Sequence, residues 1–173
     1  KKIKMPIDEL IKKQFDKMIS ILEDKKYLHY EISNFAKSDF QSVNNCNYWL
    51  RKPYLGIGPS AHSFDGHFKR SWNVSNINLY MKSIKEGELC FGEENLTISE
   101  SYNEYIMLGL RTSSGVSLRK IEKIFGSKYL KYFMKQIDIY IDSKMLSMDG
   151  DIIKITANGK FISDKIASDL FKL

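Results

Sequence analysis

The order of helical and hairpin patterns after residue 96 most constrains the fold of this chain. Thr97 to Glu100 read Thr-Ile-Ser-Glu, a capping box in which the glutamate reaches back to the residue that starts a helix. Apolar periodicity predicts helices at about 97–112, 117–125, 127–142 and 157–171. Asp149-Gly150, between two short apolar runs, predicts a β-hairpin before the last of them. Three helices, a two-stranded wing and a closing helix indicate a winged-helix-like domain.

Residues 1–96 show a different pattern and predict a separate domain. Apolar residues repeat every three to four positions over 7–25, which predicts an amphipathic helix. In "YLHYEISNF" (27–35), apolar residues alternate with His29, Glu31 and Ser33, as in a strand with one packed and one polar face. A helix followed by a strand after a short turn is half of a βα repeat. We therefore place a domain boundary between residues 96 and 97.

The rest of the first domain combines a loop, a hairpin and a helix. Residues 37–52 have no period and predict a long loop. Asp65-Gly66 predicts a hairpin with strands near 60–64 and 67–72, and a helix is expected over 75–86. Gly109, inside the first helix of the second domain, costs about 1 kcal/mol relative to alanine and indicates close packing there.

Composition limits the cellular setting and the partners. The chain has 173 residues and two cysteines, Cys46 and Cys90, without the spacing of a metal site, which is typical of reduced thiols in a cytoplasmic protein. No apolar run is long enough to span a membrane. The net charge of +6 is spread evenly along the chain, so a nucleic-acid partner is not indicated. The chain begins at Lys1 without a methionine, which suggests a piece of a longer protein.

Several residues have both a structural and a functional interpretation. A packed or solvated role is favoured for His29, while Glu31 either lies on a solvated edge or points into the lumen of a β/α barrel. His62 and His67 lack a third ligand at useful spacing, so no metal site is predicted. Cys46 is interpreted as a small packed residue or as a thiolate ligand of heme iron.

A basic stripe on the predicted third helix gives the other functional alternative. Lys128, Lys131 and Lys135 lie where a winged helix would contact DNA. Asp138 and Asp142 continue the same stripe and would repel phosphate. A solvated face is therefore favoured over a nucleic-acid-binding one.

Five stretches, in this order, resemble one protein family. They are "HYEISNFA" (29–36), "NNCNYW" (44–49), "YLGIGPSAHSF" (54–64), "NEYIMLGLRTSSG" (103–115) and "ITANGKFISDKIASDLF" (155–171). Together they resemble the C-terminal part of oxygen-independent coproporphyrinogen III oxidase-like radical SAM proteins, in particular the heme chaperone subgroup. The resemblance covers nearly the whole chain.

The resemblance implies an α+β fold in two parts. Residues 1–96 would be the terminal helix and strands of a partial β/α barrel, and residues 97–173 the helical, winged-helix-like C-terminal domain. The parent would hold a [4Fe–4S] cluster and S-adenosylmethionine, although the cluster cysteines are not in this sequence. Ala36, Gly56, Gly58 and His62 match positions on the S-adenosylmethionine side. Glu31 would then face the substrate lumen.

The family also suggests a role for "NNCNYW". In the heme chaperone subgroup this stretch usually reads His-Asn-x-x-Tyr-Trp and is associated with heme binding. Asn45, Tyr48 and Trp49 match, but Asn44 stands where the histidine is expected. An amide is a poor iron ligand, so either this mode of heme binding is lost or Cys46 or a nearby histidine replaces it. The aromatic pair could still stack on a porphyrin.

Three functions follow as hypotheses. The first is the C-terminal part of a radical SAM protein that handles heme or porphyrin, with an oxidoreductase-like parent and no turnover expected from this chain alone. The second is a non-catalytic heme carrier that delivers heme to an accepting protein. The third is a winged-helix nucleic-acid binder.

Overall fold

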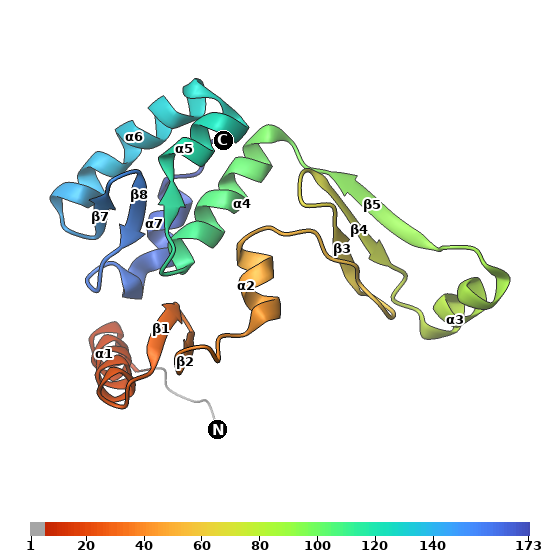
Figure 1. Cartoon of the computed structure of the whole chain (residues 1–173), viewed down its shortest axis with the longest axis horizontal. Helices are drawn as coiled ribbons and strands as arrows, with labels where there is room; N and C mark the ends of the chain where they lie inside the picture. Colours follow the sequence, from red (N-terminus) through yellow and green to blue (C-terminus); the bar gives the residue numbers. More distant parts are fainter. Residues whose placement is uncertain (1–5) are drawn as a thin grey trace. The chain divides into compact units, whose positions relative to one another are not determined.

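The structure is a computed structural model that describes residues 6–173 and has a mixed α+β fold (Figure 1). The chain divides into two compact units. The first unit contains the described part of Lys1–Ser42 together with Ile106–Phe171, and the second contains Val43–Tyr105 and Lys172–Leu173. The predicted boundary between residues 96 and 97 stays a prediction, and the first five residues of the predicted 1–96 domain lie outside the described part.

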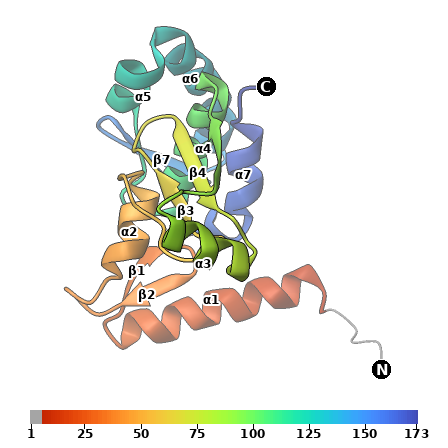
Figure 2. The same cartoon turned by 90° about the vertical axis from the view of Figure 1, so that its right-hand side faces the viewer.

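The N-terminal part of the first unit is a helix followed by a hairpin. Helix α1 (Asp8–Asp24) confirms the predicted amphipathic helix. Strands β1 (Leu28–Glu31) and β2 (Asn34–Ala36) pair antiparallel, with His29 opposite Phe35. The single strand predicted over 27–35 is therefore wrong, because the chain turns back at Ile32 and Ser33. Figure 2 shows α1 alongside this hairpin. Phe15 of α1 contacts the ring of His29 edge to face, with centroids 6.4 Å apart.

The C-terminal part of the first unit follows the predicted order of elements. Its described elements, in chain order, are the end of α4 (Ile98–Arg111), β6 (Val116–Ser117), α5 (Leu118–Phe125), α6 (Ser127–Asp142), β7 (Leu146–Asp149), β8 (Ile152–Ile155), η1 (Lys160–Ile162) and α7 (Ser163–Asp169). The strands form a sheet in the order β6-β8-β7, in which β7 and β8 are the predicted hairpin. The closing helix is shorter than the predicted 157–171. Figure 1 shows α5 and α6 next to the hairpin.

The core of the first unit forms where these helices meet the sheet. Ile121, Phe133 and Ile153 are fully buried apolar residues from α5, α6 and β8. Gly109 confirms the predicted close packing, because a Cβ at this position would lie 2.6 Å from Val116 Cγ2. The end of α4 therefore lies directly against β6.

The second unit is built on a three-stranded antiparallel sheet in the order β3-β4-β5. Its described elements are α2 (Val43–Trp49), β3 (His62–Phe64), β4 (Lys69–Asn73), α3 (Ile77–Glu86), β5 (Phe91–Asn95) and the start of α4. The predicted hairpin at Asp65-Gly66 joins β3 to β4, and the Asp65 carboxylate accepts hydrogen bonds from the turn. The predicted capping box is present at the start of α4, with Thr97 N donating to Glu100 Oε2 at 2.7 Å.

Two features of the second unit differ from the sequence predictions. The segment 37–52 is not a continuous loop, because residues 43–49 form α2 and place "NNCNYW" on a helix. Strand β5 was not predicted; it pairs with β4 and carries mostly exposed residues.

Candidate functional site

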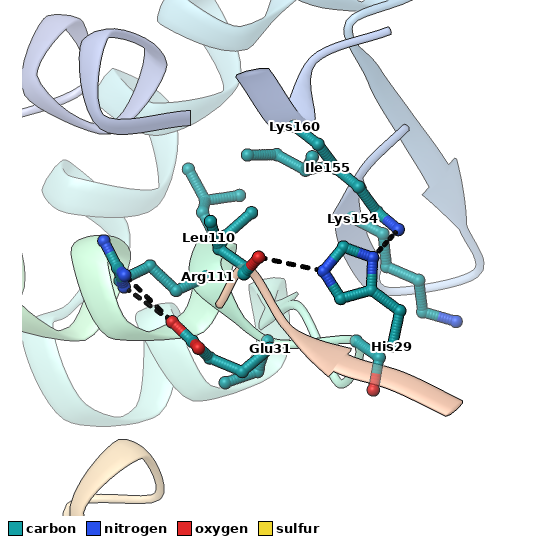
Figure 3. A pocket seen from close by; sticks show the side chains of 10 residues that line it. His29, Glu31, Leu110, Arg111, Lys154, Ile155 and Lys160 are labelled. Carbon is teal, nitrogen blue, oxygen red and sulfur yellow. Dashed lines mark hydrogen bonds and ion pairs between the residues drawn. The ribbon is translucent and has the colours of Figure 1, made fainter. Parts of the chain in front are cut away.

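A cavity of about 220 Å³ lies in the first unit, between the start of the β1–β2 hairpin and the C-terminal elements (Figure 3). Glu31 and Arg111 lie on one side of it, and His29 and Lys160 on the other. The end of α4 is fixed to the hairpin by backbone hydrogen bonds, from Ile32 N to Arg111 O and from Ser113 N to Tyr30 O, both at 3.0 Å. The walls of the cavity therefore belong to one hydrogen-bonded framework.

Glu31 is the buried acid of this cavity, with only 3% of its surface exposed. Its Oε1 lies 3.0 Å from Arg111 Nε and 2.9 Å from Nη2, a two-point ion pair. Its Oε2 accepts hydrogen bonds from Ser33 N and from the side chain of Asn34. A solvated position for Glu31 is therefore wrong, because the carboxylate holds both the turn and the arginine. Its role in a substrate lumen stays a prediction.

The surroundings of His29 confirm that it is a packed histidine whose two ring nitrogens both have hydrogen-bond partners. Its ring stacks on Phe35 with centroids 4.1 Å apart. Nε2 lies 3.0 Å from the carbonyl oxygen of Ile32, which can only accept, so Nε2 carries the proton. Nδ1 therefore accepts from the Lys160 ammonium at 2.7 Å. Burial lowers the pKa of His29, and the positive charge of Lys160 adds to this effect.

We expect the free energy of unfolding to fall as the pH drops below about 6.5. His29 has a lowered pKa in the folded state, so the unfolded chain binds more protons in this range and is favoured there. Lys160 opposes protonation of His29, while Glu23 and Glu31 favour it. Urea denaturation across this range should show a steeper pH dependence for the wild type than for His29→Gln. Equal slopes for the two proteins would contradict this assignment.

The second unit has an open hollow of about 470 Å³ that contains part of the predicted heme loop. Tyr48 from α2 and Tyr54 contact each other edge to face, with ring centroids 4.7 Å apart. His62 and the strongly exposed Leu55 and Ile57 also line the hollow. The hollow therefore combines aromatic rings and exposed aliphatic side chains with polar groups, one of them an imidazole. The rings and aliphatic side chains suit a flat ligand that has an apolar face and polar edges.

Helix α2 explains how the remaining residues of "NNCNYW" are arranged. Asn44 and Tyr48 are four residues apart and share one face of the helix, as do Asn45 and Trp49. Asn44 is exposed, and Cys46, which is half-buried, does not line the hollow. The helix therefore places position 44 next to the tyrosine that lines the hollow.

The four residues matched to the S-adenosylmethionine side fall in different units. Ala36 is buried at the end of β2 in the first unit. Gly56 and His62 line the hollow of the second unit, and Asn73 Nδ2 donates to the carbonyls of Gly56 and Gly58. A Cβ at Gly56 would lie 2.2 Å from the carbonyl oxygen of His62, whereas Gly58 has a positive φ of 108° and open space. Gly56 is therefore required by the protein backbone itself, and the cofactor role of all four residues stays a prediction.

An ion-pair network holds Arg51, the second residue after the end of α2. Arg51 Nη1 donates to the carbonyl and hydroxyl oxygens of Ser101 at 2.6 and 2.9 Å. Glu104 lies between two arginines: its Oε2 is 3.3 Å from Arg51 Nη2 without hydrogen-bond geometry, and its Oε1 pairs with Arg70. This network fixes the end of α2 to α4 within the second unit.

Sequence patterns missed two charged residues of the cavity in the first unit, Arg111 and Lys160. Arg111 and Lys160 are 80 and 131 residues from their partners Glu31 and His29, so no local spacing could link them. The resemblance included both residues within its motifs but gave them no role. The basic stripe on α6 is exposed together with Asp138 and Asp142, as expected of a solvated face.

Neither a metal cluster nor a membrane helix emerges from the described residues. Residues 6–173 hold no group of three or more histidine, cysteine, aspartate or glutamate side chains placed to bind a metal. Over the same range, every helix is too short or too polar to cross a bilayer.

Comparisons with known proteins agree on one family. Residues 96–162 match the family described as the HemN C-terminal domain. A heme chaperone HemW from Lactococcus lactis is 31% identical over 157 residues, covering 91% of this chain and 41% of the relative. The solved structure of coproporphyrinogen III oxidase (HemN) from Escherichia coli aligns with a TM-score of 0.67 at 17% identity, covering 91% of this chain and 40% of that one.

The chain corresponds to the C-terminal part of a HemN-like radical SAM protein. A mitochondrial radical S-adenosyl methionine domain-containing protein 1 from Dictyostelium discoideum is also similar, with 30% identity over 195 residues, 99% of this chain and 44% of the relative. The family predicted from the sequence motifs is therefore confirmed. The chain spans about two fifths of the length of these HemN-like relatives.

Proposed function

We propose that this part of the HemN-like protein binds heme and passes it to an accepting protein. The observation that carries the proposal is the hollow of the second unit, where Tyr48 of the predicted heme loop, Tyr54 and His62 line one surface together with exposed aliphatic residues. Two similar proteins, from Lactococcus lactis and Bacillus subtilis, are named heme chaperones. The residues that line the hollow and the names of these two relatives are separate reasons to propose heme as the ligand.

The exposed apolar side chains are the first argument for heme. Leu55 and Ile57 are 79% and 85% exposed, and they lie beside the Tyr48–Tyr54 pair. Adjacent exposed apolar residues on a protein surface usually mark a binding site. A porphyrin face would cover them, while its propionates could stay in water. An open hollow also suits a ligand that must later be released to another protein.

The available iron ligands are the second argument. His62 lines the hollow, and its ring contacts Trp72 with centroids 5.9 Å apart. Neutral imidazole is a good ligand for heme iron, whereas the amide of Asn44 is not. Cys46 is the alternative thiolate ligand, although it does not line the hollow. We therefore assign His62, and not Cys46, as the first candidate to bind iron in place of the missing histidine.

The radical SAM chemistry belongs to the whole protein and is likewise a proposal. A full-length parent would bind S-adenosylmethionine at a [4Fe–4S] cluster, which supplies an electron to cleave it to a carbon radical. In this chain, Ala36, Gly56, Gly58 and His62 would contribute to the S-adenosylmethionine side. Because heme and S-adenosylmethionine are both assigned to the surface around His62, their binding is expected to compete there.

A cytoplasmic location agrees with the two free thiols but stays a prediction.

Asn44→His is expected to tighten hemin binding by about tenfold, or 1.4 kcal/mol. The new imidazole would lie one helical turn from Tyr48, on the same face of α2 and beside the hollow. Hemin titration followed by the Soret band measures this change. Tyr48→Ala should weaken binding, while Phe40→Ala, an exposed aromatic of the first unit, is the matched control and should not.

The possible outcomes show which residue binds the heme iron, and whether heme binds at this hollow at all. A Soret shift in the wild type that disappears in His62→Ala assigns iron binding to His62, and one that disappears in Cys46→Ser assigns it to the thiolate. The absence of a saturable band in both the wild type and Asn44→His would refute heme binding at this hollow.

A further inference from the structure

The cavity of the first unit is lined by three cations, and one of them, Lys160, makes no salt bridge with the described residues. Arg111 is paired with Glu31 and with Asp164, and Lys154 lies 3.4 Å from the Asp149 carboxylate. Lys160 has no such partner: among residues 6–173, no carboxylate lies within salt-bridge distance of its ammonium. Its hydrogen bond goes to the neutral His29 ring (Figure 3).

The partial burial of the Lys160 ammonium is unfavourable and would be relieved by an anion bound next to it. Burial lowers the pKa of Lys160, because a desolvated ammonium is unfavourable, and the charge of Glu23, which makes no salt bridge with it, offsets this effect only in part. An ammonium has three N–H donors, and one of them is used by His29 Nδ1. Arg111 and Lys154 also line the cavity, but Glu31, Asp164 and Asp149 already pair with them. Lys160 is therefore the cation of the lining whose N–H donors remain available to a ligand.

We propose that this cavity binds a small oxyanion, a carboxylate or phosphate-type group, with Lys160 as its main ligand. The His29 ring holds the ammonium in place through Nδ1 and is itself held by Phe35 and the Ile32 carbonyl. Glu31 keeps Arg111 at the opposite wall, where the guanidinium can attract an anion without losing its partner. The site is thus built from side chains that are already fixed before the anion enters.

The size of the cavity limits the ligand. A volume of about 220 Å³ is below that of pockets that enclose whole drug-sized molecules, which is roughly 300–1,000 Å³. The cavity therefore accommodates a free ion or the charged end of a longer molecule. This site lies within the first unit and is independent of the proposed heme hollow in the second.

Sulfate is the suitable probe, because it is an oxyanion that does not titrate near neutral pH. We expect it to raise the thermal unfolding temperature saturably, as binding to the folded state does, while chloride at equal ionic strength does not. Isothermal titration of the same chain should give the dissociation constant. Phenyl sulfate distinguishes the two sources: tighter binding than sulfate assigns the cavity to the end of a larger ligand, and equal binding assigns it to a free ion.

Three variants test the ligand residue. Lys160→Gln should weaken sulfate binding at least tenfold, whereas Lys160→Arg, which keeps the charge, should retain most of it. Lys154→Gln is the matched control at the same cavity and should change binding less than threefold, because its ammonium is already paired with Asp149. His29 ring resonances in NMR spectra should shift on sulfate addition in the wild type, which locates the anion. The absence of a saturable response, or equal binding by wild type and Lys160→Gln, would overturn the proposal.

Discussion

Glu104→Ala is expected to lower the free energy of unfolding of the second unit by about 4 kcal/mol. The carboxylate lies between Arg51 and Arg70, and its side chain is only 17% exposed. Removing it leaves two guanidinium groups close together in a partly desolvated site. Burial and the charge of Arg70 already lower the pKa of Arg51, in line with this repulsion. Urea denaturation followed by circular dichroism measures the loss.

The matched control is Glu94→Ala, which removes a more exposed acid that also faces Arg70 in the same unit. Exposed ion pairs of this kind contribute about 0–1 kcal/mol, so this change should be small. We also expect Glu104→Ala to weaken hemin binding at the hollow, because Arg51, two residues after the end of α2, fixes that end of the helix. A loss below about 1 kcal/mol for Glu104→Ala would show that the arginines find other partners.

Glu31→Ala is expected to destabilise the first unit by about 3 kcal/mol. The change removes the acceptor for Ser33 N, for the Asn34 amide and for the Arg111 guanidinium in a fully buried position. Arg111 keeps one partner, Asp164, which makes the expected loss smaller than for Glu104. Thermal and urea denaturation check the value.

Asp164→Ala is the control for the same arginine. The Asp164 side chain is 80% exposed, so its removal should cost less than about 1 kcal/mol. Glu31→Gln should fall between the two, because an amide keeps an acceptor oxygen but not the charge. If Glu31→Ala and Asp164→Ala were equally destabilising, the buried pair would not be the interaction that fixes the hairpin.

The parts of the fold that sequence could predict depend on local signals. The capping box at Thr97, the hairpins at Asp65-Gly66 and Asp149-Gly150, and the amphipathic helices all have their cause within a few residues. Each of these predictions is confirmed. At these positions the local sequence preference and the tertiary structure favour the same conformation, so the sequence patterns predict the structure correctly.

The errors occur where long-range contacts decide the local structure. The asparagine-rich segment of α2 has weak helix formers, and the helix is supported by Arg51, whose partners lie about 50 residues away. The β1–β2 turn at Ile32-Ser33 lacks glycine, and the Glu31 carboxylate stabilises it through Ser33 N and Asn34. Strand β5 has no apolar alternation because its side chains are mostly exposed. None of these causes can be read from a short window of sequence.

The candidate site was predictable to a similar degree. The motifs singled out Tyr48 and His62, which the structure places on one hollow. They also singled out Glu31, although its burial and its pairing with Arg111 depend on contacts 80 residues away. Lys160 was not recognised, since a lone lysine within the helix predicted over 157–171 gives no signal until its neighbour His29 is known.

Both tryptophans of the chain, Trp49 on α2 and Trp72 on β4, belong to the second unit. Intrinsic tryptophan fluorescence therefore follows that unit alone, without an engineered label. Trp49 lies on the helix that carries Tyr48, and Trp72 contacts the ring of His62. Heme absorbs at the emission wavelength of tryptophan and would quench both by energy transfer. Unfolding that is confined to the first unit would not change this fluorescence. The two tryptophans therefore distinguish unfolding of the second unit from unfolding of the first.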